Sequence, residues 1–135
     1  MAIRVKGIDH VVIRTENLRK MLDFYSNVLG CVSVRSSTES GLYQLSAGDA
    51  LVDLVDVEGK LGKQGGPAPA SDGHNMDHYC LILETWDEVA IRATLERHDV
   101  EAGETKMRNG GLGKTASIFI RDADGNRVEL KGPVE

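Results

Sequence analysis

Apolar and polar residues alternate along residues 8–14, and this period of two predicts a first β-strand. Residues 18–29 then carry apolar side chains at helical spacing. We expect a helix there, capped by Asn17 and ended by Gly30 in the left-handed conformation. Three further strands are expected after turn residues, at 31–36, 42–47 and 50–57. The first part of the chain is therefore predicted to have the order βαβββ.

The same order of elements recurs in the last part of the chain. A strand is expected at 76–83, and a helix is expected to begin at Thr85, which has capping-box spacing to Glu88. The segment DADGN is a strong hairpin turn, and strands are expected at 100–105, 115–122 and 126–131. The Gly- and Pro-rich segment between the two parts indicates an exposed connection. One domain, 1–135, is therefore expected, with a module at about 1–57, a linker at 58–75 and a module at about 76–135.

Two Asp-His pairs open the matching strands of the two modules. They lie at 9–10 and 77–78, which is a separation of 68 positions. Alignment of GDALVDL with DGNRVEL also places Asp53 and Glu129 at the same point of the last strand, 76 positions apart. The larger separation predicts about eight additional residues in the second module, which we expect in the Gly-rich stretch 107–114. Such an internal duplication can bring side chains of both copies to one site.

Each of these side chains has a structural interpretation beside the functional one. A single histidine on an apolar strand face is more often a hydrogen-bonded core residue than a metal ligand. The pair His10 and His78 favours metal binding, because apolar neighbours would leave both rings unsatisfied. Asp53 also lies between apolar residues of its own strand face. Glu129 shares a face with cationic residues that we expect to be solvated. Only its match to Asp53 in the other module therefore makes it a candidate metal ligand.

The four candidates form a chemically consistent set. Imidazole nitrogen and carboxylate oxygen are ligands that suit Zn, Ni, Fe or Mn. A mixed set of this kind leaves positions open for water or substrate. His10, Asp53, His78 and Glu129 are therefore candidate ligands of one divalent metal ion.

Composition and charge narrow the classes of partner. The formal net charge is −5, so no basic surface for nucleic acid is expected. No apolar run approaches the ~20 residues that span a bilayer, and no secretory segment is recognised at the start. We therefore expect a cytoplasmic protein with no membrane partner. Cys31 and Cys80 are too far apart in sequence for a CxxC metal site and are expected in the core.

Three segments carry a family resemblance across essentially the whole chain: IDHVVIRTENLRKMLDFYSNVLG, DHYCLILE and FIRDADGNRVELK. They are similar to the vicinal oxygen chelate superfamily, which includes glyoxalase I, the bleomycin-resistance proteins and the extradiol dioxygenases. The resemblance implies an α+β fold in which two paired βαβββ modules form a curved mixed-sheet cup around a divalent metal. It also implies a homodimer, and it places His10, Asp53, His78 and Glu129 at the metal-ligand positions.

On this resemblance, the leading functional hypothesis is a metal-dependent lyase or isomerase of the lactoylglutathione lyase type. Such an enzyme stabilises an enediolate on its metal, and its substrate would be a small molecule such as a glutathione adduct. The resemblance implies that Glu129, with Asp53 as its counterpart, transfers the proton between substrate carbons. It also implies that Arg14 binds a carboxylate of the substrate.

Three alternatives stay open. The glyoxalases commonly have Glu or Gln where this chain has Asp53. Without Asp53, the residues His10, His78 and Glu129 form the two-His, one-carboxylate set of Fe(II) dioxygenases. A protein of the bleomycin-resistance type would instead sequester a ligand without metal, and a thiol transferase of the fosfomycin-resistance type would open an epoxide.

Overall fold

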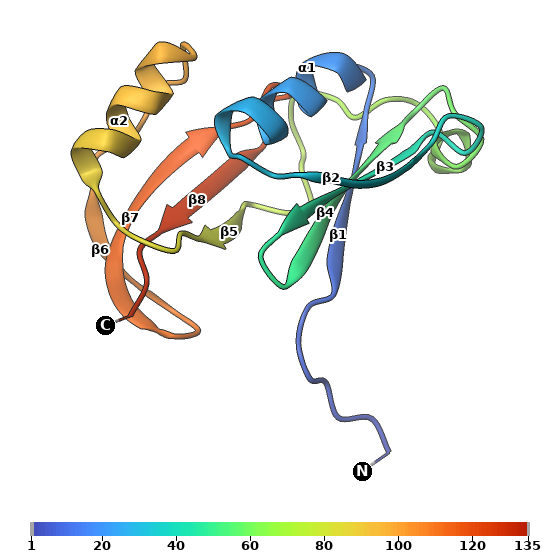
Figure 1. The fold of residues 1–135 in the computed structure, drawn as a ribbon. Coiled ribbons are helices and arrows are strands. Elements are labelled where there is room, and N and C mark those ends of the chain that lie inside the picture. The colour runs from blue at the N-terminus through green and yellow to red at the C-terminus, as the bar shows by residue number, and fades with distance from the viewer. Residues whose placement is uncertain (1, 135) are drawn as a thin grey trace. The chain divides into compact units, whose positions relative to one another are not determined.

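A computed structural model describes residues 2–134 of the chain. The described residues divide into two compact units, with the boundary between Pro69 and Ala70. Each unit contains one four-stranded mixed sheet and its own helix (Figure 1). Within residues 2–134, no helix has both the length and the apolar character that crossing a membrane requires.

The first unit has the predicted βαβββ order. Its elements are β1 (His10–Thr15), α1 (Leu18–Asp23), a π-helical turn η1 (Phe24–Val28), β2 (Ser33–Ser37), β3 (Leu42–Ala47), β4 (Ala50–Asp56) and a 3-10 turn η2 (Gly62–Gly65). The strands lie in the order β1-β4-β3-β2. β1 and β4 are parallel, and the other two pairs are antiparallel. α1 lies against the sheet at β4.

The helix predicted for residues 18–29 is present, but its hydrogen bonding changes midway from α1 to the π-helical turn η1. Met21, Phe24 and Tyr25 are buried along it and pack toward the sheet. Gly30 then adopts φ 73°, and the amide of Cys31 donates to the carbonyl oxygen of Tyr25 at 2.8 Å. This six-residue closure confirms the glycine-dependent end that the sequence predicts.

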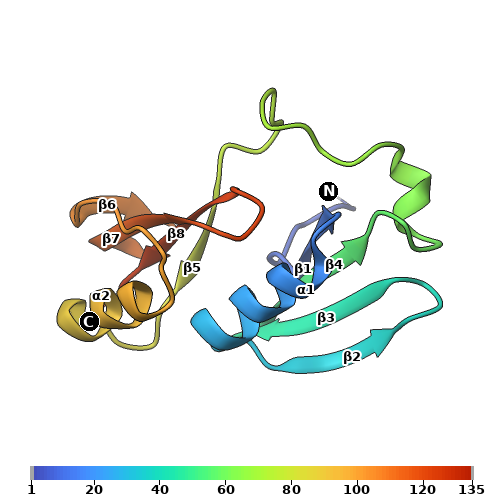
Figure 2. The ribbon, with the colours of Figure 1, turned by 90° about the horizontal axis from the view of Figure 1, so that it is seen from above.

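The second unit repeats the first. Its elements are β5 (Tyr79–Ile82), α2 (Glu88–Arg97), β6 (Lys106–Gly110), β7 (Gly113–Arg121) and β8 (Arg127–Lys131). The sheet order β5-β8-β7-β6 matches the order of the first unit strand for strand, with the same parallel first pair. α2 lies along one face of this sheet (Figure 2). The predicted duplication and the α+β fold class are therefore confirmed.

Two predicted boundaries in the second unit were wrong. The helix begins at Glu88, not at Thr85, and its N-cap is Asp87, whose side chain accepts from the amide of Ala90 at 3.1 Å. The strand expected at 100–105 is absent, and β6 lies directly after it. β6 has the sequence KMRNG, with hardly any apolar alternation, because it is an edge strand that pairs only with β7.

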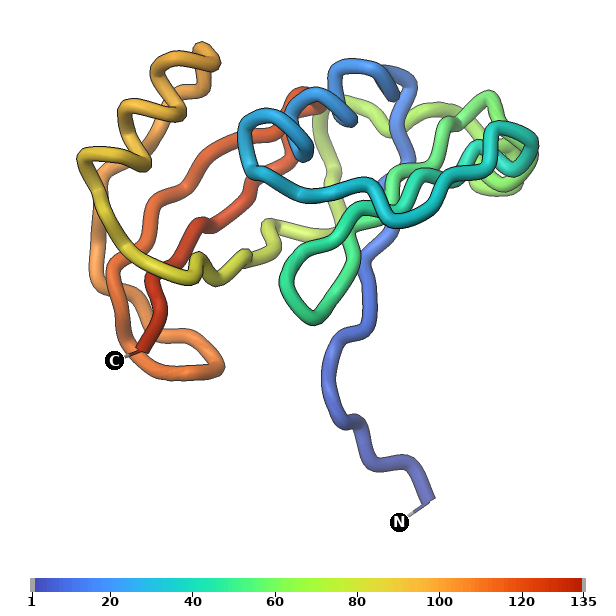
Figure 3. Tube along the Cα trace, in the orientation of Figure 1, coloured from blue at the N-terminus to red at the C-terminus, as the bar shows by residue number. Residues whose placement is uncertain are grey.

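Most of the additional residues of the second unit lie in the β6–β7 hairpin, which contains the predicted stretch 107–114. The stretch 107–114 forms a tight hairpin between β6 and β7 (Figure 3). β7 has 9 residues where the equivalent β3 has 6, and a longer turn, 122–126, follows it. In that turn, Oδ1 of Asp122 accepts from the amides of Asp124 and Asn126, both at 2.9 Å. The span from Phe119 to Glu129 is 10 positions and that from Gln44 to Asp53 is 9, so the β7–β8 connection contributes only one of the additional residues.

Part of the stretch 58–75, expected to be an exposed connection, is folded onto the first unit. Gly62 opens η2 and is buried against the end of β4. A Cβ atom at this position would lie 1.9 Å from the carbonyl oxygen of Asp56 and 2.6 Å from the Cα of Val57. Only glycine fits this approach of two backbone segments.

Substitution Gly62→Ala is expected to lower the free energy of unfolding by about 1–3 kcal/mol, the usual cost of overpacking, because the backbone around Asp56 must move. Gly111→Ala is the matched control, since its added Cβ meets nothing within 4 Å. The control should change stability by less than ~0.5 kcal/mol. Urea unfolding of both variants measures the difference, and equal midpoints would contradict the packing at Gly62.

Candidate functional site

The first pair of candidate ligands lies on one face of the first sheet. His10 is the first residue of β1, and Asp53 lies in the middle of β4. In the parallel register, His10 pairs with Leu51 and Val12 pairs with Asp53, so His10 and Asp53 point to the same side. The opposite face carries buried apolar residues, among them Ile13, Val52 and Leu54.

Asp53 is almost completely buried, with 2% of its surface exposed. Its Oδ2 accepts a hydrogen bond from Nε2 of Gln44 at 3.1 Å, and Oε1 of Gln44 accepts from Nε of Arg35 at 2.8 Å. Its Oδ1 is buried and has no hydrogen-bond partner within residues 2–134. An unpaired buried carboxylate oxygen is costly. This atom fits a metal ligand, because a cation would supply the missing partner.

His10 is oriented by the aspartate that precedes it. Its Nδ1 lies 2.6 Å from Oδ2 of Asp9. Because an ionised carboxylate can only accept, Nδ1 carries the proton and Nε2 keeps the lone pair that a metal requires. The hydrogen bond to Asp9 raises the pKa of His10 above its ordinary value of 6.5; a smaller desolvation effect opposes it, and the negative charges of Asp53 and Asp9 add to it.

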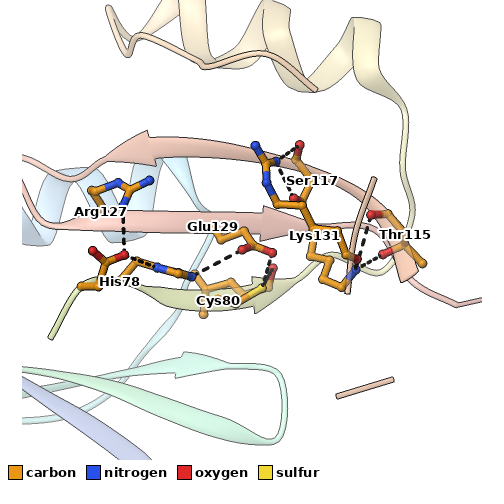
Figure 4. Close-up of polar contacts among 10 residues, drawn as sticks. His78, Cys80, Thr115, Ser117, Arg127, Glu129 and Lys131 are labelled. Carbon is orange, nitrogen blue, oxygen red and sulfur yellow. Dashed lines mark hydrogen bonds and ion pairs between the residues drawn. The ribbon is translucent and has the colours of Figure 1, made fainter. Parts of the chain in front are cut away.

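The second pair of candidate ligands is in direct proximity. His78 precedes β5 by one residue, and Glu129 lies in the middle of β8. Nε2 of His78 is 3.5 Å from Oε1 of Glu129, and Figure 4 shows the two side chains facing each other. Glu129 is 6% exposed. The second sheet therefore presents an imidazole and a buried carboxylate together.

Asp77 repeats the role of Asp9 and has an additional partner. Its Oδ2 lies 2.7 Å from Nδ1 of His78 and accepts from Nη1 of Arg127 at 2.9 Å. The hydrogen bond to His78, followed by the charge of Arg127, holds the pKa of Asp77 below its ordinary value. The His78 ring also packs edge-on against Phe119, with the centroids 4.9 Å apart. Within the described residues, the carboxylate of Asp9 has no hydrogen-bond partner other than His10, and its carbonyl oxygen accepts from the amide of Leu51.

Cys80 is a site residue that the sequence reasoning missed. It was expected in the core, as Cys31 is, but it is exposed and pairs with Glu129 across the β5–β8 register. Its Sγ lies 3.5 Å from Oε2 of Glu129. Desolvation, followed by the negative charge of Glu129, raises the pKa of Cys80 to about 11. The residue is therefore a thiol at neutral pH, and strand alternation from His78 is the signal that could have identified it.

The polar face of β8 is more buried than its pattern predicts. Arg127, Glu129 and Lys131 were expected to be solvated, yet Glu129 and Lys131 are both buried. Nζ of Lys131 donates to the carbonyl oxygen of Arg108 and to Oγ1 of Thr115, both at 2.6 Å. The expectation was wrong because neighbouring side chains of the same sheet face cover these two residues.

Arg14, the candidate for a substrate carboxylate, has its contacts with the stretch after β4. Its Nη2 donates to the carbonyl oxygen of Gly62 at 2.9 Å, and Nη1 donates to that of Pro67 at 3.2 Å. It also donates to the carbonyl oxygen of Gly66. These bonds hold residues 62–67 against β1, and the role of Arg14 in substrate binding stays a prediction.

The candidate ligands come in pairs, one pair in each unit. Taken by itself, and within residues 2–134, neither unit gathers three or more His, Cys, Asp or Glu side chains that could hold a metal ion. Each pair joins a histidine whose Nδ1 is engaged by the preceding aspartate with a buried carboxylate from the last strand of its sheet. That the two pairs together hold one metal ion stays a prediction.

Comparison with known proteins identifies relatives of the whole chain. The family model that describes the Glyoxalase/Bleomycin resistance protein/Dioxygenase superfamily matches residues 7–130. The glyoxalase domain-containing protein RDO1 of Mycosarcoma maydis is 28% identical over 130 residues, which cover 95% of this chain and 69% of that protein. The match therefore includes both units.

The solved structures that share this fold include an integron cassette protein, a lactoylglutathione lyase and a fosfomycin resistance protein. An integron cassette protein of Vibrio cholerae superposes with a TM-score of 0.78 and 22% identity, over 99% of this chain and 100% of that one. A lactoylglutathione lyase of Agrobacterium tumefaciens has a TM-score of 0.67 and 20% identity, over 95% and 94% of the two chains. The fosfomycin resistance protein FosX of Mesorhizobium loti has a TM-score of 0.68 and 17% identity, over 97% and 95%. Identities this low show a common fold only.

Substitution Asp9→Ala is expected to lower the pKa of His10, because the hydrogen bond to Asp9 is the largest cause of its elevation. A raised pKa in the folded state means that the contribution of His10 to stability is complete below its unfolded pKa. That contribution is lost as the pH rises through the folded pKa. An NMR titration of the metal-free protein measures this change.

The same spectra report the protonated ring nitrogen. In the metal-free wild type above its pKa, His10 should carry its proton on Nδ1, whereas Asp9→Ala should release this preference. Asp9→Asn is the conservative control, because its amide oxygen still accepts the bond. If His10 keeps its pKa and its tautomer in Asp9→Ala, then Asp9 does not orient the ring.

Proposed function

The chain belongs to the Glyoxalase/Bleomycin resistance protein/Dioxygenase superfamily, and on this premise we propose that it is a metal-dependent lyase or isomerase of the lactoylglutathione lyase type. The observation that carries the proposal is the buried Oδ1 of Asp53, which has no hydrogen-bond partner within residues 2–134. A metal-free binding protein gains no stability from such an atom. A divalent cation pairs with it and offsets the cost of burying the carboxylate.

The proposed ligands are His10, Asp53, His78 and Glu129. Their chemistry fits Zn, Ni, Mn or Fe, which imidazole and carboxylate ligands bind in mixed sets. The contact between His78 and Glu129 supports the assignment. With Nδ1 protonated toward Asp77, Nε2 of His78 and Oε1 of Glu129 are both acceptors, 3.5 Å apart. His78 and Glu129 would both be satisfied as ligands of a bound metal ion. We further propose a homodimer as the working assembly and a small molecule as the substrate.

Glu129 is the proposed residue for proton transfer. A bound divalent ion supplies Lewis acidity to vicinal oxygens of the substrate and makes the adjacent C–H bond more acidic. The carboxylate of Glu129 takes that proton and returns it to the neighbouring carbon, so that the enzyme regains its starting state. Its buried position excludes competing water.

The properties of Cys80 are compatible with proton transfer by the neighbouring Glu129. At neutral pH it is a thiol that lies beside Oε2 of Glu129, and its pKa of about 11 keeps it protonated. A thiol is a weak donor, so it orients the carboxylate without neutralising its basicity. Asp53 is the counterpart of Glu129 in the first unit, but it is one methylene shorter and we assign it to metal binding first.

The metal assignment predicts that the purified protein binds a divalent ion and that Asp53→Asn weakens its affinity by about 10–100-fold, since ligand and support residues have effects of at least this size. Asp49→Asn is the control, because Asp49 is an exposed carboxylate in the turn before β4. Elemental analysis and equilibrium dialysis measure both.

The outcomes separate the alternatives. If Asp53→Asn binds metal as well as the wild type but His10→Gln does not, the ligand set reduces to that of the Fe(II) dioxygenases. If chelation changes neither the unfolding midpoint nor ligand binding, the protein is a metal-free sequestering protein.

The proton-transfer assignment predicts that Glu129→Gln lowers kcat by about 10²–10⁴-fold, the usual contribution of a general base. Turnover is measured with the hemithioacetal of methylglyoxal and glutathione, at metal concentrations that saturate the variant. Glu104→Gln, which alters an exposed carboxylate outside the strands, serves as the control. Metal binding without turnover of this substrate would overturn the substrate assignment and leave the ligand set intact.

A further inference from the structure

The face of the second sheet that carries Glu129 also carries cationic side chains from neighbouring strands. In the antiparallel register, Arg108 pairs with Thr115, Ser117 with Lys131, and Phe119 with Glu129. Residues paired in this way lie on the same face, and so do alternate residues of one strand. Arg108 and Lys131 therefore share the face of the proposed proton-transfer residue.

Arg108 is held in place along one side of its guanidinium group. Its Nη1 donates to the carbonyl oxygen and to Oγ of Ser117, both at 2.8 Å. Its Cζ lies 4.6 Å from the ring centroid of Phe119, so the group also stacks on the aromatic face. Within residues 2–134, Nε and Nη2 of Arg108 have no hydrogen-bond partner. This leaves one two-pronged edge of a fixed guanidinium available.

Lys131 adds positive charge beside Arg108 without a free donor of its own. Its Nζ uses three neutral acceptors, the carbonyl oxygens of Arg108 and Thr115 and Oγ1 of Thr115, and Figure 4 shows it lying against Thr115. Lys131 is 3% exposed. In the described part of the chain, neither Lys131 nor Arg108 forms an ion pair with a carboxylate. Buried lysines are normally paired with an anion, so the unpaired Lys131 leaves positive charge beside the partly buried Arg108.

Arg127 provides an internal contrast. Its guanidinium also lies over Phe119, with Cζ 4.3 Å from the centroid, but Asp77 neutralises it at 2.9 Å. The two arginines therefore share one aromatic ring, and only Arg108 is left without a counter-charge. In a chain whose net charge is −5, such a local concentration of positive charge attracts anions that the rest of the surface repels.

We propose that the free edge of Arg108 binds an oxyanion of the substrate, a carboxylate or a phosphate-type group, in a bidentate manner. Lys131 strengthens the attraction through its charge and fixes the backbone of Arg108. This inference rests on the proposed function in one respect, which is that the reacting carbon lies at Glu129, on the same sheet face. It deepens that function by naming the substrate class: small molecules with an oxyanion group next to the reacting part.

A side-chain NMR titration of the full chain tests the proposal. The protein is treated with chelator, so that no metal competes for the anion, and is titrated separately with inorganic phosphate and with acetate. The Nε–Hε signal of Arg108 is expected to shift with phosphate, with acetate or with both. The anion that binds more tightly identifies the kind of oxyanion that the site prefers. Arg108→Gln should weaken binding by roughly tenfold or more, because a charge-assisted pair is lost. Arg108→Lys keeps the positive charge but loses the two-pronged guanidinium edge. Its anion affinity should lie between those of the wild type and Arg108→Gln.

Arg97→Gln is the matched control, since Arg97 is an exposed arginine of α2. Equal anion binding by the wild type and by Arg108→Gln would overturn the proposal, and so would the absence of a shift with either anion. If Arg108→Gln loses anion binding while the wild type holds no metal, the proposed reaction fails and the anion site stands. If the enzyme turns over substrate, Arg108→Gln should raise KM for an anionic substrate at least tenfold more than it lowers kcat; a loss confined to kcat would contradict a binding role.

Discussion

Each sheet buries a carboxylate in its last strand, and the polar side chains around it are arranged as its partners. Asp53 and Glu129 lie at equivalent points of β4 and β8, and both are almost inaccessible to solvent. A carboxylate in such a place needs partners on its own sheet face. Gln44 supplies one to Asp53, and Cys80 and His78 approach Glu129. The opposite face of each strand is apolar, which separates the chemistry from the core.

The order of elements followed from the sequence wherever one face of an element is apolar. β3 and β4 begin where the alternation predicts, because their inward residues form the core of the first unit. β6 was missed because an edge strand gains little from apolar alternation and is defined by pairing with β7. The start of α2 was misplaced because Thr85 and Asp87 are both good capping residues. The choice between them depends on the extended backbone of Asp87, which a sequence pattern does not contain.

The candidate-site residues that have an equivalent in the other module could be predicted from the sequence. Matching of the two copies identified Glu129, although its strand pattern alone indicates a solvated residue. The residues that the duplication cannot identify are those with no equivalent in the other copy. Phe119 faces Glu129, whereas Gln44 stands at the matching position beside Asp53. The contacts of Cys80 and Arg108 arise from strand register and side-chain direction, which single-residue patterns do not specify.

The two Asp-His pairs differ in how firmly they are held. Asp77 is bound by Arg127, which stacks on Phe119, and the His78 ring rests on the same aromatic side chain. The side chain of Asp9 is 90% exposed, and its only hydrogen-bond partner among the described residues is His10. The Asp-His pair of the second module is therefore supported by more side-chain contacts than the pair of the first module. Substitutions at Asp9 remove fewer side-chain contacts than substitutions at Asp77, so the sequence beside His10 has more freedom to change than the sequence beside His78.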